Sequence, residues 1–342
     1  MTHDFPRLLF VHNAATSFVE LDKEMLSTFC AVTEYALHSR RVSPLATWKA
    51  VRAHDLVFGW FASWHTFLPL LFARLMRKPS ILVIGGYDLA CLPAIGYGHQ
   101  RGGPKHSGSF KKWISRATMN LATRLITNSR FSQNEARVNA NIRPERVTVI
   151  YHGVPDRFGA ADALTRERLA LTVGNVSQSN LSRKGLESFV RAAALLPDVS
   201  FVLAGRCVDD AFDYLKSIAT PNVTLTGWIE DAELIHYYQR ASVYVQVSQH
   251  EGFGMSLAEA MLAGCIPVVT SVCAIPEVTG ESAIFTPSQA PEAVANAVTQ
   301  ALAAPQSLGA QARDRINRLF PLRRRRDALE AIVKSLLPSP KI

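Results

Sequence analysis

Short apolar runs alternate with longer helical patterns along most of this 342-residue chain. A strand followed by a helix and another strand forms a βαβ unit, and repeated units build a parallel sheet. One series begins at Arg7–Val11, and a second begins at Leu169–Val173 after a break rich in Gly and Pro at His152–Gly159. We therefore predict two α/β domains. The other expected strands are Asp55–Gly59, Ile81–Ile84, Arg124–Thr127, Val147–Ile150, Ser200–Leu203, Asn222–Leu225, Val243–Val247 and Ile266–Thr270.

The segment His250–Thr270 (HEGFGMSLAEAMLAGCIPVVT) follows one expected strand and has glycines at positions 252 and 254. Glycine lets a backbone approach a ligand closely. The composition of Ser256–Ala263 predicts a helix, whose free N–H groups and positive dipole end attract anions. Glu251 precedes the glycines and Glu259 lies about one turn inside the helix, so both carboxylates are candidates to accept hydrogen bonds from sugar hydroxyls. The alternative is an ordinary strand–loop–helix with two exposed glutamates.

The string EGFGMSLAEAMLAGCIPVV resembles the Glu-x7-Glu signature of the GT4-type retaining glycosyltransferases, which have the GT-B fold. Three further segments resemble parts of the same family: ITNSRFSQNEA, VIYHGVPDRF and RKGLESFVRAAALLPDVSFVLAG. The resemblance covers most of residues 120–285. It implies two Rossmann-like parallel-sheet domains with a cleft between them: an acceptor domain over residues 1–153 and a nucleotide-sugar donor domain over residues 154–320. A C-terminal helix, about residues 321–342, is expected to cross back to the first domain.

The resemblance also implies roles for the residues of the glycine-containing string. Glu251 would contact the donor sugar. Phe253 and Gly254 would contact the sugar or the diphosphate through backbone N–H groups, with the diphosphate lying over Gly252 and Gly254. Glu259 would hold the ribose hydroxyls of the nucleotide.

Lys184, in a Lys-Gly pair, would neutralise the donor diphosphate, since lysine is an effective point charge for phosphate. The alternative is a solvated lysine at a helix start. The family often has Gly-Arg after the first strand of the second domain, whereas this chain has Gly174-Asn175, so Asn175 takes the place of an arginine that grips diphosphate. Arg183 is the candidate replacement, because a guanidinium binds phosphate oxygens bidentately. The alternative is a surface arginine.

The first domain departs further from the family pattern. Many relatives carry His-Gly-x-Asp after a strand, whereas this chain has Gly-Gly-Tyr-Asp ending at Asp88. Asp88 is the candidate for acceptor binding or electrostatic support of the reaction, and the alternative is an aspartate that caps a turn. His12 stands where the family has a Gly-rich loop, as an acceptor contact or an ordinary loop histidine. The segment Tyr87–Ser109 is long for a connection, so we expect a functional loop or a partly mobile one.

The resemblance implies the reaction as well. A nucleoside diphosphate leaves the anomeric carbon of the donor sugar, the configuration is retained, and the leaving phosphate helps to take the acceptor proton. Lys184 and helix N–H groups would stabilise the negative charge on that phosphate. The family works without a metal, and the chain has no DxD string. We therefore expect a nucleotide sugar as substrate, with neither a metal nor another cofactor.

The net charge of +9 is unevenly distributed. Residues 1–150 hold 19 basic and nine acidic side chains, residues 151–310 hold nine and 16, and residues 311–342 hold nine and three. Phe110–Ile126 reads as a basic amphipathic helix, and Arg323–Arg326 is a basic run in a helix predicted to end at residue 337. If the last helix crosses back to the first domain, the basic regions 1–150 and 311–342 would share one side, facing an anionic membrane or a glycan, lipid-linked or phosphorylated acceptor. The alternative is a pair of solvated charged helices.

Five cysteines without a CxxC pair favour a reducing compartment. The opening MTHDFPRLLFVHN lacks the basic and apolar regions of a signal peptide. No apolar run approaches the ~20 residues of a membrane-spanning helix. We therefore expect a cytoplasmic protein, either free or peripheral on the inner face of a membrane. The pattern indicates no oligomeric state.

Three other functions compete with transfer of a sugar. The first is a catalytically degenerate, glycosyltransferase-like binding protein. The second is a nucleic-acid-binding module, which is suggested by charge alone; because no helix-turn-helix or RNA-binding string is present, we expect no nucleic-acid partner. The third is a Rossmann dehydrogenase, against which Leu257 occupies the place of the third glycine of its fingerprint.

Overall fold

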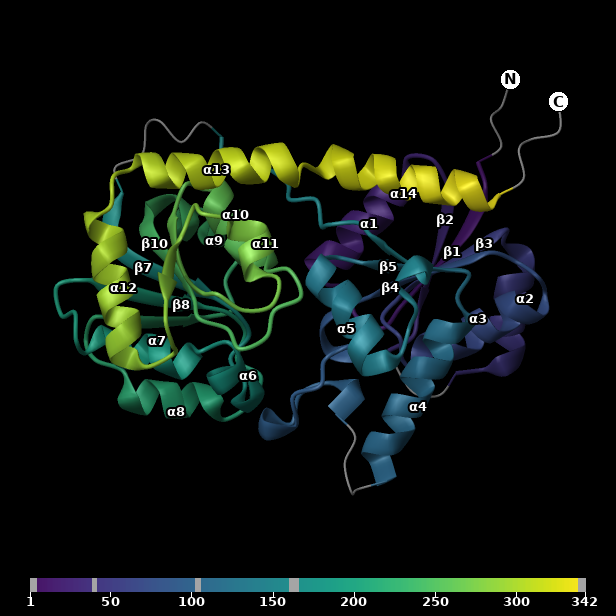
Figure 1. Cartoon of the computed structure of the whole chain (residues 1–342), viewed down its shortest axis with the longest axis horizontal. Helices are drawn as coiled ribbons and strands as arrows, with labels where there is room; N and C mark the ends of the chain where they lie inside the picture. The colour runs from purple at the N-terminus through teal and green to yellow at the C-terminus, as the bar shows by residue number, and fades with distance from the viewer. Residues whose placement is uncertain (1–4, 39–41, 102–105, 160–165, 338–342) are drawn as a thin grey trace. The chain divides into compact units, whose positions relative to one another are not determined.

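The computed structural model describes residues 5–38, 42–101, 106–159 and 166–337. The chain forms two compact units (Figure 1). Unit 1 comprises Met1–Gly153 and Leu322–Ile342, and unit 2 comprises Val154–Pro321. Each unit holds one six-stranded sheet in which all the paired strands are parallel. The predicted α/β class, with two Rossmann-like sheets, is confirmed.

The sheet of unit 1 has the strand order β2-β1-β3-β4-β5-β6. Its inner strands are apolar runs such as SILVI in β4, buried on both faces. The sequence pattern does not predict β2, because AVTEYA lacks an apolar run and the strand lies exposed at the sheet edge. The strands are β1 (Arg7–His12), β2 (Ala31–Ala36), β3 (Leu56–Trp60), β4 (Ser80–Ile84), β5 (Arg124–Thr127) and β6 (Val147–Val149).

Helices cover both faces of this sheet, because successive side chains of a strand point to opposite sides. Leu9 and Leu82 pack in the core under α2, α3, α4 and α5, whereas Leu8 and Ile81 pack in the core under α1 and α14. The α-helices are α1 (Ser17–Ser27), α2 (Pro44–Ala53), α3 (Trp64–Leu75), α4 (His106–Leu121), α5 (Arg130–Ala140) and α14 (Leu322–Leu336), and the short 3₁₀ helices are η1 (Gly86–Asp88), η2 (Pro93–Ile95), η3 (His99–Arg101) and η4 (Pro144–Arg146).

A buried ion pair ties the C-terminal helix α14 to unit 1. The guanidinium of Arg325 donates to both carboxylate oxygens of Asp22 on α1, at 2.5 and 2.7 Å, and each side chain is 1% exposed. Arg325 also donates to the backbone carbonyls of Ile150 and Tyr151. A bidentate pair with further hydrogen bonds is the arrangement in which burial of two charges is best compensated.

Two corrections concern the basic segments of unit 1. The helix predicted over Phe110–Ile126 ends at Leu121, because the chain must turn there to let β5 pair with β4. The helices α4 and α14, which carry the two basic segments, cover opposite faces of the sheet (Figure 1). Within the run Arg323–Arg326, Arg325 points into the core instead of to solvent.

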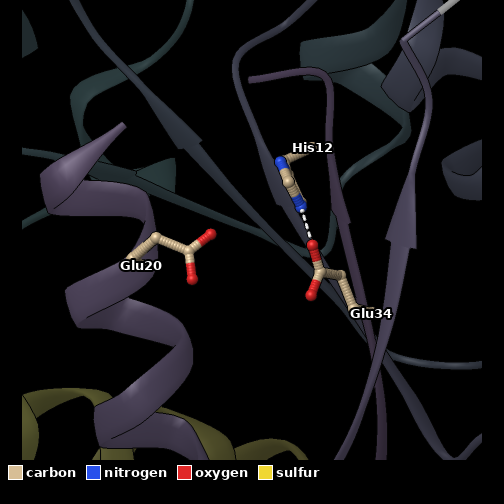
Figure 2. Close-up of side chains that lie close together, drawn as sticks. All are labelled: His12, Glu20 and Glu34. Carbon is tan, nitrogen blue, oxygen red and sulfur yellow. Dashed lines mark hydrogen bonds and ion pairs between the residues drawn. The ribbon is translucent and has the colours of Figure 1, made fainter. Parts of the chain in front are cut away.

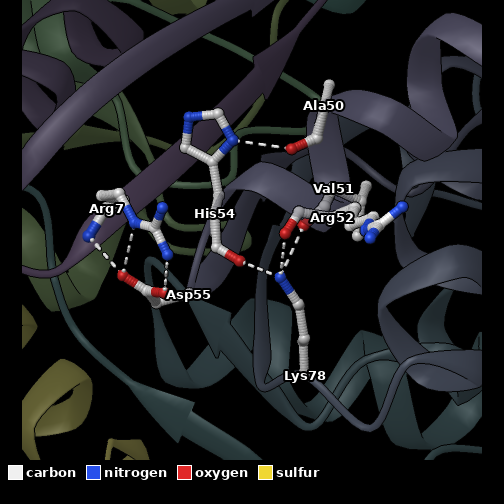
Figure 3. A network of polar contacts seen from close by, with 7 residues as sticks. All are labelled: Arg7, Ala50, Val51, Arg52, His54, Asp55 and Lys78. Atoms are coloured by element: carbon white, nitrogen blue, oxygen red, sulfur yellow. Dashed lines mark hydrogen bonds and ion pairs between the residues drawn. The ribbon is translucent and has the colours of Figure 1, made fainter.

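A lysine stabilises the end of α2 (Figure 3). The ammonium of Lys78 donates to the backbone carbonyls of Val51, Arg52 and His54, which a helix C-terminus leaves without intrahelical partners. Burial lowers the pKa of Lys78. Next to it the guanidinium of Arg7 donates to the Asp55 carboxylate, and this pair joins the starts of β1 and β3.

The sheet of unit 2 has the strand order β12-β11-β10-β7-β8-β9. Helices α7, α8 and α12 pack on one apolar core, and α9, α10 and α13 also pack against the sheet. The strands are β7 (Glu167–Val173), β8 (Ser200–Ala204), β9 (Val223–Gly227), β10 (Ala241–Gln246), β11 (Ile266–Thr270) and β12 (Ile284–Thr286). The helices are α6 (Gln178–Arg183), α7 (Leu186–Ala193), α8 (Ala211–Ile218), α9 (Asp231–Arg240), α10 (Met255–Leu262), α11 (Ile275–Thr279), α12 (Pro291–Ala303) and α13 (Ser307–Leu319).

Each sheet has one place where the strand order reverses. In unit 1 the chain runs outward in opposite directions from β1 and β3, and in unit 2 from β7 and β10. In open parallel sheets, ligands bind beyond the carboxyl ends of the strands at such switch points. Among the described residues, no helix is both long and apolar enough to span a bilayer.

Candidate functional site

The switch point of unit 2 lies between the loops that follow β7 and β10. The first loop starts with Gly174-Asn175, and the second leads through Glu251 to α10. The predicted residues of the second domain come from these two loops, from α6 and from α10. The fold therefore brings together residues that are up to 84 positions apart (Asn175 to Glu259).

The Lys-Gly pair positions Lys184 in this site. Gly185 has a φ of +71°, and a Cβ there would lie 2.5 Å from the Val247 side chain and 2.7 Å from its carbonyl oxygen. Only glycine fits this left-handed and crowded position. The chain thus turns directly after Lys184, whose side chain lies against Gly174 at the end of β7.

Lys184 and Glu251 form the charged centre of the site. The ammonium of Lys184 lies 3.9 Å from a carboxylate oxygen of Glu251, and the side chains are 20% and 18% exposed. This separation is longer than a hydrogen bond, so both groups keep capacity for a ligand. The Gln246 amide donates to the same carboxylate oxygen at 3.4 Å. Burial lowers the pKa of Lys184, and the negative charge of Glu251 opposes that effect.

Gly254 precedes the first turn of α10. Its φ of +96° is a left-handed conformation, and a Cβ there would lie 3.2 Å from the Gln246 amide nitrogen. The side chain of Phe253 is 2% exposed and packs edge-on against Phe320. A ligand can therefore meet Phe253 only through its backbone. The helix N-terminus beyond these residues supplies N–H groups and a positive dipole end.

Glu259 projects from α10 toward α9. The Tyr238 hydroxyl lies 3.2 Å from a Glu259 carboxylate oxygen and 3.2 Å from the Ser256 carbonyl oxygen. One hydroxyl proton cannot serve both acceptors fully. Burial raises the pKa of Glu259 to about 7, and the Tyr238 hydrogen bond opposes the rise. In the protein without ligand, the hydrogen bond from Tyr238 therefore compensates only part of the cost of burying the Glu259 carboxylate. The carboxylate can still accept strong hydrogen bonds from donor groups of a ligand.

Arg183 and Asn175 are held by one neighbour, Asn180. The Arg183 guanidinium is buried and donates to the Asn180 side-chain oxygen and to the His250 carbonyl oxygen. The Asn180 amide in turn donates to the carbonyl of Asn175 at 2.7 Å. These bonds link the two loops of the site. A contact of Arg183 with diphosphate stays a prediction, and it would require exchange of these hydrogen bonds.

In unit 1, Asp88 follows β4 and is 1% exposed. Its carboxylate accepts hydrogen bonds from the backbone N–H groups of Gly85 and Ala62, each at 2.9 Å. The bond to Gly85 is the turn-capping contact that the sequence allowed. The same residue lines a cavity, so its role toward an acceptor stays open to test. Burial raises the pKa of Asp88 to about 7.

His12 ends β1 and points toward β2 (Figure 2). Its Nε2 lies 2.8 Å from a Glu34 carboxylate oxygen, and Glu20 on α1 completes a group of three possible metal ligands. The ammonium of Lys23, however, pairs with Glu20 at 2.5 Å and with Glu34 at 2.9 Å. Lysine therefore already supplies the positive charge between these carboxylates, and we assign no metal here.

Sequence reasoning missed Tyr238, Asn180 and Gln246, each of which contacts a predicted residue. Tyr238 lies in an ordinary amphipathic helix, and Asn180 and Gln246 belong to no recognisable string. Asn180 and Gln246 bond to predicted residues within five positions of the chain, whereas Tyr238 reaches Glu259 from 21 positions away, so only the contact of Tyr238 depends on the packing of a separate helix.

Two models of known protein families match segments of this chain. A model described as "Glycosyl transferases group 1" matches residues 167–304, and one described as "Glycosyltransferase Family 4" matches residues 29–158. The chain belongs to the GT4-type glycosyltransferase family. The match over residues 167–304 contains Lys184 and the Glu-x7-Glu string, and the match over residues 29–158 contains Asp88.

Characterised relatives share parts of this GT4 chain. A GDP-mannose:cellobiosyl-diphosphopolyprenol alpha-mannosyltransferase of Xanthomonas campestris is 30% identical over 148 residues, which is 41% of this chain and 39% of that protein. A D-inositol 3-phosphate glycosyltransferase of Mycolicibacterium gilvum is 26% identical over 338 residues, 90% of this chain and 71% of that protein. The match to the mannosyltransferase thus spans about two fifths of its length.

Solved structures share the GT-B fold. Anabaena HepE in complex with UDP and glucose superposes with a TM-score of 0.75 at 16% identity and covers 97% of this chain and all of that one. Sucrose-phosphate synthase of Thermosynechococcus elongatus gives a TM-score of 0.74 at 17% identity, with 97% and 99% covered.

Proposed function

We propose that this protein is a retaining, metal-independent glycosyltransferase that moves a sugar from a nucleoside diphosphate donor to a glycan, lipid-linked or phosphorylated acceptor. The observation that carries the proposal is the placement of Lys184 3.9 Å from Glu251 at the switch point of unit 2. The N-terminus of α10 and Glu259 lie on the same loop–helix segment. The second domain thus combines one cation, one helix end that attracts anions, and two carboxylates that can accept hydrogen bonds from hydroxyl groups.

Each group has a task that its environment supports. Lys184 would stabilise the negative charge that develops on the leaving diphosphate, together with N–H groups at the start of α10. Its side chain is only 20% exposed, and this desolvation strengthens its attraction for phosphate over that of an exposed lysine. Glu251 would accept hydrogen bonds from the donor sugar, and Glu259 from the ribose.

The step itself needs no further reactant. The acceptor oxygen forms a bond to the anomeric carbon on the face from which the diphosphate departs, while the bond between that carbon and the phosphate oxygen breaks. The acceptor proton passes to the leaving phosphate oxygen. The electron pair of the broken bond stays on the diphosphate, beside Lys184.

The names of similar proteins indicate which nucleotide sugars should be tested first as donors. One relative is named for GDP-mannose, and one structural neighbour holds UDP and glucose. We therefore propose a hexose donor carried on GDP or UDP. Isothermal titration with both nucleotides and their mannose and glucose conjugates tests the donor site.

Two variants separate binding from transfer. Lys184→Ala should lower the rate of transfer about 100- to 1,000-fold, the range for loss of one group that stabilises an oxyanion. Glu251→Gln should lower the rate of transfer by a larger factor than it lowers the affinity for nucleotide. Lys216→Ala, an exposed lysine on α8, is the matched control. Unchanged transfer in both site variants would refute the assignment, and nucleotide binding without transfer or hydrolysis by the wild type would favour the degenerate binding protein.

We also propose contact with an anionic membrane, at the inner face, through α4. Phe110 and Trp113 are 60% and 57% exposed, their rings stack at 6.0 Å, and Lys111 and Lys112 lie between them in sequence. Exposed aromatics beside lysines suit the interface of an anionic bilayer. Liposomes with phosphatidylglycerol should retain the protein at low salt, and Trp113→Ser should weaken this retention whereas Trp228→Ser should not. Failure to float at low salt would end this idea.

A further inference from the structure

In unit 2 the loop that follows β8 runs alongside the loop that follows β7. The two strands pair in parallel register, and a parallel bridge between Val176 and Cys207 continues the same register beyond the strand ends. The Val176 N–H donates to the Arg206 carbonyl at 2.9 Å. The register therefore places Arg206 directly beside Asn175 at the carboxyl edge of the sheet.

Close backbone contacts hold the two loops together. A Cβ on Gly205 would lie 2.1 Å from the Gly174 carbonyl oxygen, so only glycine allows this approach. Further along the chain, both carboxylate oxygens of Asp209 accept hydrogen bonds from the backbone N–H of Gln178, the first residue of α6, at 3.1 Å. The backbone of Arg206 thus lies between two anchored points, which fixes where its side chain begins.

The guanidinium of Arg206 is available to a ligand. Arg206 is exposed, and within the described parts of the chain its side chain forms no hydrogen bond or ion pair. The carboxylates of its own loop have other partners, since Asp209 and Asp210 both accept hydrogen bonds from Gln178. All five N–H donors of the guanidinium can therefore serve an anion.

The charge of the donor site calls for a second cation. The terminal phosphate of a nucleoside diphosphate carries about −1.5 to −2 charges at pH 7. Lys184 supplies one positive charge, and Glu251 offsets part of it from 3.9 Å. The buried Arg183 guanidinium already donates to Asn180 and to the His250 carbonyl. A positive group from another residue would complete the charge balance.

Arg206 begins close enough to Lys184 to supply that group. A Cβ on Gly174 would lie 3.5 Å from the Lys184 ammonium nitrogen. Because Gly174 directly precedes Asn175, Arg206 is one residue and one strand spacing of about 4.8 Å away from it. A guanidinium that starts there can bind phosphate oxygens bidentately beside the ammonium.

We propose that Arg206 binds the phosphate groups of the nucleotide donor together with Lys184. The identity of the anion as a nucleoside diphosphate rests on the proposed function. The position of the guanidinium beside Asn175 rests only on the pairing of β7 with β8. The competing interpretation is a solvated arginine that contacts no ligand.

Isothermal titration with UDP, GDP and inorganic pyrophosphate tests this assignment. Arg206→Ala should weaken binding of these diphosphates about tenfold, the loss expected for a hydrogen bond between charged groups, and should leave the affinity for uridine and guanosine unchanged. Arg206→Lys keeps the charge but not the planar fork, so it should weaken binding by a smaller factor. Arg318→Ala, which removes an exposed arginine of α13, is the matched control and should change nothing.

A relocated arginine provides a second test. Because Asn175 and Arg206 are neighbours in register, Asn175→Arg should restore most of the diphosphate affinity that Arg206→Ala removes. Failure to restore it would contradict the placement of Arg206 beside Asn175. Both side chains are exposed, so the variants without ligand should unfold at the wild-type temperature.

The outcomes separate this inference from the proposed function. If UDP or GDP binds Arg206→Ala as tightly as the wild type, the inference is refuted and the donor site stands. If the variant loses affinity for the nucleosides as much as for the diphosphates, Arg206 contacts the base and the inference is wrong. If pyrophosphate binds through Arg206 but neither nucleotide binds, the phosphate contact is supported and the nucleotide donor fails. If none of the three binds the wild type, both proposals fail.

Discussion

Glu259→Gln should stabilise the free protein and weaken its affinity for nucleotide. Burial raises the pKa of Glu259 from 4.5 to about 7 in the folded chain. The folded state therefore holds the proton more tightly than the unfolded state, so the carboxyl group contributes stability below pH 4.5 that is lost as pH rises to 7. At about 1.4 kcal/mol for each pKa unit, the rise from 4.5 to about 7 makes ionisation cost roughly 3–4 kcal/mol at pH 8. A neutral amide avoids this cost.

Thermal unfolding of wild type and variant at pH 8 and pH 5 measures the effect. For a unit of this size about 1 kcal/mol moves the midpoint by 2–4 °C, so Glu259→Gln should unfold several degrees higher at pH 8. The gap should narrow toward pH 5, where wild-type Glu259 is protonated. Glu233→Gln, an exposed glutamate on the neighbouring α9, is the matched control and should show no such gap.

Nucleotide binding should change in the opposite direction. A carboxylate accepts hydrogen bonds from two ribose hydroxyls more strongly than an amide does, so the variant should bind UDP or GDP about tenfold more weakly, a loss of ~1.4 kcal/mol. A variant that is less stable at pH 8, or that binds nucleotide as the wild type does, would refute the role of Glu259 as a strained ligand-binding carboxylate.

Three further predictions concern Glu259, Gly185 and Asp22. Wild-type affinity for nucleotide should fall about tenfold from pH 8 to pH 6, because Glu259 takes up a proton with a pKa of about 7; calorimetry against Glu259→Gln, which should lack this step, checks it. Gly185→Ala should unfold at markedly lower denaturant and lose nucleotide binding, since a Cβ would lie 2.5 Å from Val247; Gly159→Ala, with open space around its Cβ, is the control for a positive φ. Asp22→Asn should destabilise unit 1 by about 3–5 kcal/mol in urea unfolding, because it leaves the buried Arg325 charge unpaired, and a loss below 1 kcal/mol would contradict that role.

Local patterns were sufficient to predict several features of this protein. The alternation of apolar runs and helices predicted two parallel sheets, because a βαβ unit is specified by residues close together in the chain. Glu251 and Glu259 are eight residues apart on one loop–helix segment, so their common location followed from local structure. Lys184 directly precedes Gly185, so its position in this loop also followed from residues close together in the chain. The edge strand β2 and the sides on which α4 and α14 pack could not be predicted in this way, because they depend on the whole sheet.

Tertiary structure alone decided how the candidate groups are arranged. The 3.9 Å approach of Lys184 to Glu251 spans 67 residues, and the Asp22–Arg325 pair spans 303. Such distances depend on strand order and helix packing, which no local pattern encodes. The same holds for burial: Glu259 and His65 have perturbed pKa values because of the neighbours that surround them. The sequence by itself therefore determined which chemical groups the protein carries and on which elements, and packing determined which of them meet and in what electrostatic environment.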